Sequence, residues 1–149
     1  MIKPILSYDN EKDKIILSSV STPVENVLST DTKEIIQDLK DTLAATDNGK
    51  GLSAVQIGVL KRICICSWGG KEIVLINPII THCRGEKEYL EGCLSVPNKY
   101  KKIKRAQKVW CSYLDENGET QEIAEGGRMS NIIQHELDHF DGVCKIYEE

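Results

Sequence analysis

The residues best suited to chemistry lie near the C-terminal end, in the segment His135-Glu136-Leu137-Asp138-His139. Because an α-helix turns about 100° per residue, side chains four residues apart face the same way, so His135 and His139 can bind one metal ion. Glu136 lies beside them and can take a proton from a water molecule that the metal activates. The same three residues are also compatible with a charged surface helix, so the interpretation depends on a further ligand.

A catalytic centre of this kind needs a third protein ligand. A third histidine six residues downstream is excluded because Lys145 stands there, and the ten residues after His139 are too few for a glutamate on another helix. The third ligand is therefore expected upstream, where His82 and Cys93 are the candidates. Gly92 precedes Cys93 and permits a close approach of the backbone. A Cys93 thiolate would leave the fourth metal position open for water.

The elements that must position these residues follow from the hydrophobic pattern. A helix is expected from Asp31, which has capping-box spacing to Glu34, to about residue 46, and a closing helix over Gly127–Phe140. Residues before the first helix are expected to be irregular. Strands, most of them in hairpins, are expected at Arg62–Ser67, Glu72–Asn77, Ile79–Cys83, Lys108–Asp115 and Thr120–Ala124. This order predicts an α+β fold with mainly antiparallel strands around a central H-E-x-x-H helix, in a single domain over residues 1–149.

The composition limits the classes of protein to be considered. The chain has 149 residues, 40% of them hydrophobic, and a net charge of −4, which argues against a protein that mainly coats nucleic acid. No apolar run is long enough to span a membrane, and the start has no apolar signal segment. A cytoplasmic monomer without membrane contact is expected. Residues 99–108 are strongly basic, which indicates a solvated strand face or a patch for an anionic partner.

Three segments resemble the signature motifs of the peptide deformylase family. They are E-G-C-L-S at Glu91–Ser95, Q-H-E-L-D-H at Gln134–His139, and a G-x-G-L-A-A-x-Q segment at Gly49–Gln56, in which Ser53 replaces an alanine. They occur in the family's order, and Arg105 also resembles the family. The resemblance implies a metal-dependent hydrolase that removes the N-formyl group from the formyl-methionine of nascent polypeptides and releases formate.

The resemblance also implies the ligands of the metal. In the family the residues matching Cys93, His135 and His139 bind it, and the residue matching Glu136 is the general base and then the general acid. One divalent ion is expected, with Fe²⁺ favoured and Zn²⁺, Ni²⁺ or Co²⁺ as alternatives that the same ligands accept.

The same resemblance assigns the formyl oxygen to the glutamine matching Gln56 and to the backbone N–H of the residue matching Leu94. A neutral amide suits this position, because a carboxylate would repel the developing oxyanion.

Residues that bind the peptide are expected on both sides of the metal. The segment with Gly49 and Gly51 is expected to pair with the peptide like an added strand, although these glycines are also typical of a helix end. Gly92 is expected beside the peptide. Met129 and Ile132 are expected to line the pocket for the methionine side chain, in a stretch, residues 128–131, that is otherwise polar.

Two departures from the family and two alternatives remain. Residues 1–25 are expected to lie outside the resemblance. Many relatives continue into a C-terminal segment that docks on the ribosome. The expected partners are therefore the N-formylmethionyl peptides and, only transiently, the ribosome.

The host is expected to be a bacterium or a phage, with a mature organellar form as an alternative. The competing functions are a peptidase that cleaves internal amides and a non-catalytic metal-binding module.

Overall fold

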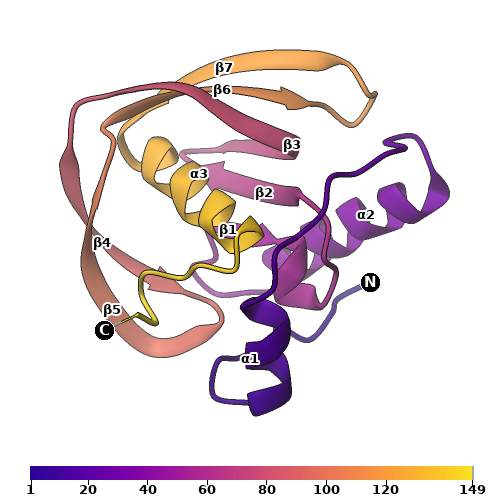
Figure 1. The fold of residues 1–149 in the computed structure, drawn as a ribbon, viewed down its shortest axis with the longest axis horizontal. Helices are drawn as coiled ribbons and strands as arrows, with labels where there is room; N and C mark the ends of the chain where they lie inside the picture. The colour runs from indigo at the N-terminus through magenta and orange to yellow at the C-terminus, as the bar shows by residue number, and fades with distance from the viewer. Residues whose placement is uncertain (149) are drawn as a thin grey trace.

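The computed structural model describes residues 1–148, and Figure 1 shows how they are arranged around one central helix. The helices are α1 (Glu11–Leu17), α2 (Thr30–Ala44) and α3 (Gly127–Phe140), with a short 3₁₀ helix, η1 (Ala54–Ile57). The strands are β1 (Gly51–Ser53), β2 (Ile63–Trp68), β3 (Lys71–Arg84), β4 (Lys87–Cys93), β5 (Val96–Arg105), β6 (Lys108–Leu114) and β7 (Thr120–Gly126). The predicted α+β class and the central position of the helix with the H-E-x-x-H motif are confirmed.

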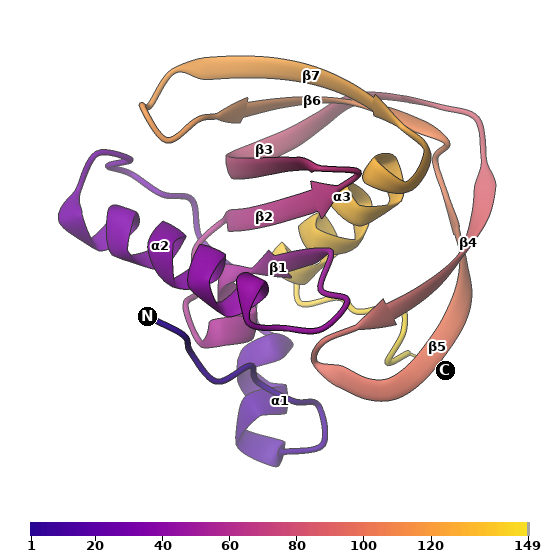
Figure 2. The same ribbon diagram turned by 180° about the vertical axis from the view of Figure 1, so that it is seen from behind.

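Two antiparallel sheets enclose α3. The larger has the order β1-β2-β3-β6-β7, and the smaller is the hairpin β4–β5. Seen from behind, α3 runs between the large sheet and this hairpin, while α2 covers the side away from the hairpin (Figure 2). The predicted hairpins β2–β3 and β6–β7 are confirmed, and Gly69 and Gly70 make the first turn with positive φ angles of 62° and 82°.

Helix α2 forms where its apolar stripe predicts it, but it begins earlier than expected. The N-cap is Ser29, whose side chain accepts the Thr32 N–H, so the expected cap at Asp31 is wrong. Ile36, Leu39 and Leu43 are buried in one cluster with residues of β1 and β2. This packing anchors the chain just before the glycine-rich segment.

Two parts of the chain differ from the prediction, one in the N-terminal segment and one in strand β3. Residues 1–31 are not wholly irregular, because α1 is capped by Asn10, which accepts the N–H groups of Lys12 and Asp13. Strand β3 continues through Asn77-Pro78, where a shift of register absorbs the break. Asn77 adopts a φ of 50° there, and its side-chain amide bonds both backbone groups of Val24.

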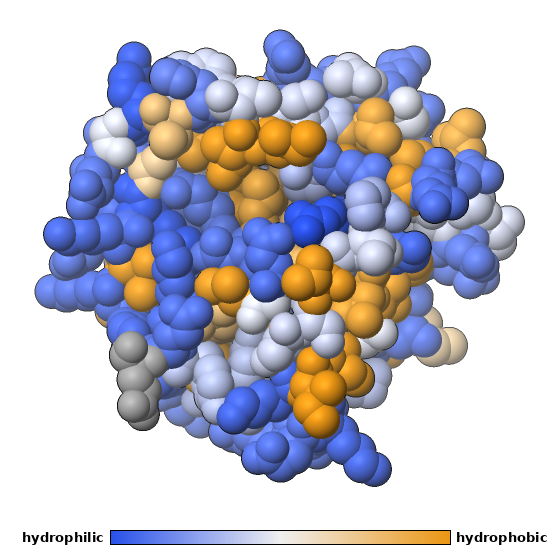
Figure 3. Space-filling view, viewed as in Figure 1, coloured by the Kyte–Doolittle hydropathy of each residue, from blue (hydrophilic) through white to orange (hydrophobic). Residues whose placement is uncertain are grey.

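The interior is mainly hydrophobic and the surface is mainly hydrophilic. Three clusters of buried hydrophobic residues lie under α2, under α3 and beside β5. The face drawn in Figure 3 is mainly hydrophilic, with apolar side chains reaching it in separate groups. None of the helices in the described part of the chain is long and apolar enough to cross a membrane.

Candidate metal centre and active site

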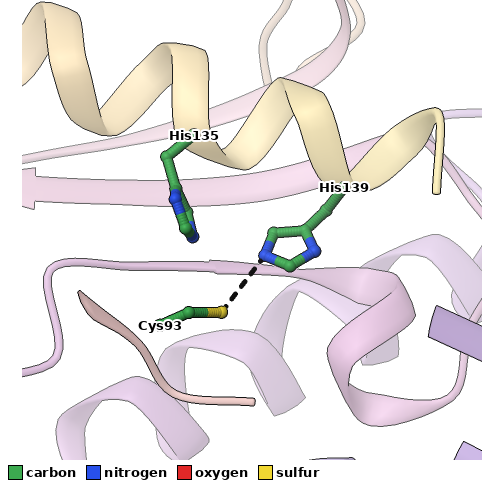
Figure 4. A group of neighbouring side chains, drawn as sticks. All are labelled: Cys93, His135 and His139. Carbon is green, nitrogen blue, oxygen red and sulfur yellow. Dashed lines mark hydrogen bonds between the residues drawn. The ribbon is translucent and has the colours of Figure 1, made fainter. Parts of the chain in front are cut away.

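A cluster of three potential metal ligands lies where α3 meets the β4–β5 hairpin. The donor atoms of Cys93, His135 and His139 all lie within 4.8 Å of one another. Both imidazoles project from α3 toward the thiol of Cys93 (Figure 4), whose Sγ is 3.4 Å from His139 Nε2. The helix supplies the two histidines because they are one turn apart, and the hairpin supplies the cysteine at its end. His82, the other candidate for the third ligand, is exposed on β3 and belongs to no such cluster in the described chain.

A buried ion-pair network orients His135. Its Nδ1 lies 3.1 Å from Glu91 Oε1, and Arg105 donates two hydrogen bonds to the Glu91 carboxylate, at 2.8 and 2.9 Å. A third donation runs from Arg105 to Asp138, at 2.6 Å, and Asn131 donates to Glu91 as well. Arg105 is therefore not part of a solvated basic face, as the basic run suggested, but a buried partner of the site.

The charges of this network fix which ring nitrogen of His135 is free. Burial alone would raise the pKa of Glu91, but the hydrogen bonds from Arg105 and His135 outweigh it and lower that pKa to about 2. An ionised carboxylate can only accept, so when the His135 ring is neutral its proton lies on Nδ1. The Nε2 atom is left with its lone pair, which is the arrangement typical of a metal-ligating histidine with a carboxylate partner.

Glu136 lies beside the ligands with a perturbed carboxyl group. It is buried, and burial raises its pKa to about 7, although a hydrogen bond from Ser53 opposes the rise. The Ser53 hydroxyl lies 2.9 Å from the Glu136 carbonyl oxygen and 3.0 Å from Oε1. A carboxyl group of this pKa can both take and return a proton near neutral pH.

Gly51 is needed for the close approach of β1 to Glu136. A Cβ atom built on Gly51 would lie 2.6 Å from Glu136 Oε2 and 3.0 Å from its Cγ. We expect Gly51→Ala to fold, because the end of a glutamate side chain can move, but to lower kcat by about 10²-fold, the effect that a displacement of about 1 Å has on a reacting group. Formate release at saturating substrate and thermal unfolding would be measured together, with Gly126→Ala as the control, because an added Cβ at this residue, which has a φ of −110°, would meet no atom closer than 3.7 Å. Unchanged kcat in Gly51→Ala would contradict this view of the contact.

Gln56 is held from both ends of its side-chain amide. Its Oε1 accepts the Ser53 N–H at 2.9 Å, and its Nε2 lies 3.1 Å from Ser95 Oγ and 3.7 Å from Cys93 Sγ. Gln56 is 1% exposed, so the amide is fixed toward the metal centre. The backbone of Leu6 donates to the Gln56 carbonyl oxygen at 2.8 Å, which ties the N-terminal segment to the site.

Leu94 occupies the tight turn of the β4–β5 hairpin next to Cys93. Among the described hydrogen bonds its backbone N–H has no acceptor. Cys93 pairs with Val96 across the turn, and Leu94 lines the same cavity as Cys93.

A cavity of about 340 Å³ opens beside the metal centre and contains most of the predicted substrate-binding residues. Gly49, Gly51, Gly92 and Ile132 line it, as do Gln56, Leu94 and Glu136. Met129 does not: it is 4% exposed and packs in the core cluster with β2 and β3. The expectation that Met129 lines the pocket is therefore not met, because this residue lies about 100° around α3 from Arg128, which does line the cavity.

Three residues of the site were not assigned a function from the sequence. Ser95 receives a hydrogen bond from Gln56, Glu91 holds His135, and Ser53 contacts Glu136. All three lie within the segments that resemble the family's signature motifs, and this position is the only feature of the sequence that points to a role for them. Their partners are far away in the sequence, so only the fold reveals the contacts.

The comparisons with known proteins agree with this geometry. The family model described as polypeptide deformylase matches residues 2–148. The expectation that residues 1–25 lie outside the resemblance is therefore wrong, and Leu6 in this segment contacts Gln56 at the site. The chain is 42% identical over 128 residues to peptide deformylase 2 of Clostridium acetobutylicum, covering 86% of this chain and 85% of that protein. It is also 42% identical over 150 residues to a peptide deformylase of Fusobacterium nucleatum, covering 98% and 83%.

Solved structures resemble the fold over almost the whole chain. A peptide deformylase from Legionella pneumophila superposes with a TM-score of 0.89 at 37% identity, covering 97% of this chain and 83% of that one. A class I type b peptide deformylase from Acinetobacter baumannii, bound to Met-Ala-Ser, gives a TM-score of 0.87 at 27% identity, covering 97% and 96%.

Proposed function

Since the chain belongs to the polypeptide deformylase family, we propose that Cys93, His135 and His139 hold the metal ion of this hydrolase. The enzyme removes the formyl group from the N-terminal methionine of nascent polypeptides in a metal-dependent reaction. The observation that carries the assignment of residues is the cluster of one sulfur and two imidazole nitrogens within 4.8 Å, beside a buried glutamate and a cavity.

The donor set fits a divalent transition metal. One thiolate and two imidazoles suit Fe²⁺, Zn²⁺, Co²⁺ and Ni²⁺, and three protein ligands leave room for substrate. When bound, the ion supplies a Lewis acid that makes water acidic enough to act as a nucleophile near neutral pH. Among these ions we propose Fe²⁺, as the family resemblance implies.

Glu136 is proposed to move the proton. Water attacks the formyl carbon, Glu136 takes the proton that this water loses, and the C–N bond breaks as the same proton passes to the departing amine nitrogen. The products are formate and a free N-terminal amine. The raised pKa of Glu136, about 7, supports both transfers.

Gln56 and the Leu94 N–H are proposed to stabilise the oxyanion that forms on the formyl oxygen. The hydrogen bonds of Gln56 to Ser53 and Ser95 fix its amide beside Cys93, and Leu94 lines the same cavity, which supports these roles. Donors fixed before the reaction gain most when charge develops on the acceptor.

We expect Gln56→Leu to lower kcat by about 10²–10³, the usual effect of losing one such donor, with little change in KM. Gln56→Glu is the matched variant, because it keeps an acceptor for the Ser53 N–H but places a negative charge beside the oxyanion, so it should be at least as impaired. Steady-state kinetics with metal-replete protein would measure both. A rise in KM alone, with kcat intact, would assign Gln56 to uniform binding instead.

The peptide backbone is proposed to lie between β1 and the hairpin. β1 is at the end of the large sheet, so its outer edge is available for an added strand, and Gly49 and Gly51 line the cavity on this side. Gly92 lines the opposite wall. The similarity to a deformylase structure that contains Met-Ala-Ser supports this placement.

Release of formate from formyl-Met-Ala-Ser under anaerobic conditions tests the proposal. Turnover that requires added Fe²⁺ and disappears with a chelator is expected. Cleavage of unblocked peptides at internal amides would favour the peptidase alternative, and stoichiometric metal without turnover would favour the binding module.

We further propose that the enzyme works as a cytoplasmic monomer in a bacterial or phage-infected cell and meets the ribosome only transiently. The nascent substrate supports this location. The exposed lysines of β5, among them Lys102 and Lys104, offer a weak electrostatic contact with RNA. Gel filtration and salt-dependent co-sedimentation with ribosomes test the two points.

A further inference from the structure

One arm of the cavity runs along α3 away from the metal centre. Ile132 and Asn131 line it about one helical turn from His135, and Arg128 lines it about two turns away, or about 10 Å along the axis. Lys50 lines the cavity from the segment that enters β1. The arm therefore has one apolar wall, at Ile132, and a cationic end.

This arm suits the side chain of the formylated residue rather than its backbone. Beyond its first turn the backbone N–H and C=O groups of α3 are bonded within the helix, so α3 offers no strand edge to a peptide. The edge of β1 and the hairpin turn do offer backbone groups. A peptide whose main chain follows β1 can therefore direct its first side chain along α3, where the arm lies.

The two cations at the end of the arm have no acidic partner. Neither Arg128 nor Lys50 makes an ion pair with any described residue. Both lie over the ring of Trp68, with the Arg128 guanidinium 5.8 Å and the Lys50 ammonium 5.6 Å from its centroid. The shared ring brings the two charges to the same end of the cavity.

Arg128 retains hydrogen-bond donors that nothing in the described chain uses. Its Nη1 bonds the Leu90 carbonyl oxygen at 3.2 Å and Asn131 Oδ1 at 3.0 Å. A guanidinium has five N–H groups, and the Nε and Nη2 hydrogens have no acceptor among the described residues. The stacking on Trp68 and on Tyr89, 5.3 Å from its centroid, holds the group in place.

From these contacts we propose that the arm accepts a first side chain of methionine length that ends in an acceptor oxygen, and hence N-formyl-methionine oxidised to its sulfoxide. The inference rests on the proposed function. The sulfoxide keeps the length of methionine but adds a polar oxygen. Its methylenes would pack on Ile132 while the oxygen takes the unused N–H groups of Arg128 and the Lys50 ammonium. A glutamate at the first position presents the same kind of oxygen with a full charge.

The test compares kcat/KM for four peptides of the form formyl-X-Ala-Ser, in which X is methionine, methionine sulfoxide, glutamate or norleucine. We expect the sulfoxide to be turned over within about tenfold of methionine, because a hydrogen bond to a charged donor offsets the desolvation of the oxygen. Arg128→Leu should lower the ratio of sulfoxide to norleucine turnover by about tenfold or more. Arg84→Leu is the matched control, since Arg84 also stacks on a ring, that of Trp110, away from the cavity.

Each outcome is decisive. If the wild type rejects both oxygen-ended side chains by a hundredfold or more while it turns over methionine, the inference is wrong and the proposed function stands. If the glutamate peptide is turned over and the sulfoxide peptide is not, the arm selects a negatively charged side chain, and the sulfoxide proposal is overturned. If no formyl peptide is turned over by metal-replete enzyme, the proposed function itself fails. Turnover of the methionine peptide by Arg128→Leu shows that this variant is folded.

Discussion

Replacing Glu136 by glutamine is expected to leave the metal bound and to lower kcat by about 10²–10⁴-fold, the usual contribution of a positioned acid–base group. Glutamine has nearly the same shape and can still accept the Ser53 hydroxyl, so the fold and the ligands should be undisturbed. What it loses is the ability to carry a proton from the attacking water to the leaving amine. Formate release and metal content would be measured on the same preparation.

The control for this variant is Glu122→Gln, which removes an exposed carboxylate on β7. It should have the kinetics of the unaltered enzyme. Near-normal turnover by metal-replete Glu136→Gln would contradict the assignment and would require another proton carrier in the cavity.

Cys93→Ala is expected to abolish tight metal binding and, with it, activity. The two histidines come from one helix, and without the thiolate the centre has only two protein ligands, fewer than the three that catalytic sites of this type use. Equilibrium dialysis followed by metal analysis under anaerobic conditions would measure the loss. Cys83→Ala is the matched control, because Cys83 is a free, exposed cysteine on β3. A variant that retains one equivalent of metal with unchanged ligand spectroscopy would rule Cys93 out.

The parts of the fold that local patterns determine could be predicted from the sequence. α3 was predicted because an apolar stripe and the histidines share its 3.6-residue period, and β2–β3 because two apolar runs flank Gly69-Gly70. The three potential metal ligands follow from the same reasoning once the cysteine motif is matched to the family.

The β4–β5 hairpin could not be predicted in the same way. Its buried positions alternate between apolar residues, which are Tyr89, Val96 and Ile103, and the charged Glu91 and Arg105, so the usual apolar row is interrupted. Buried charges of this kind are stable only when they are paired, and the partner of Glu91 is fourteen residues away on the next strand. Helix α1 could not be predicted either, because it has only seven residues and buries only Leu17, so it shows no apolar stripe.

The three-residue length of β1 has a consequence for the solubility of the enzyme. An unpaired sheet edge can template the strand of another chain, and long, flat edges lead to aggregation. A strand of only three residues at the end of the sheet presents few unpaired backbone groups to another chain. The opposite edge, β7, carries Glu122 and Glu125, whose charges discourage pairing there. Neither edge of the large sheet is thus both long and free of charge, which lowers the tendency of two copies to pair edge to edge.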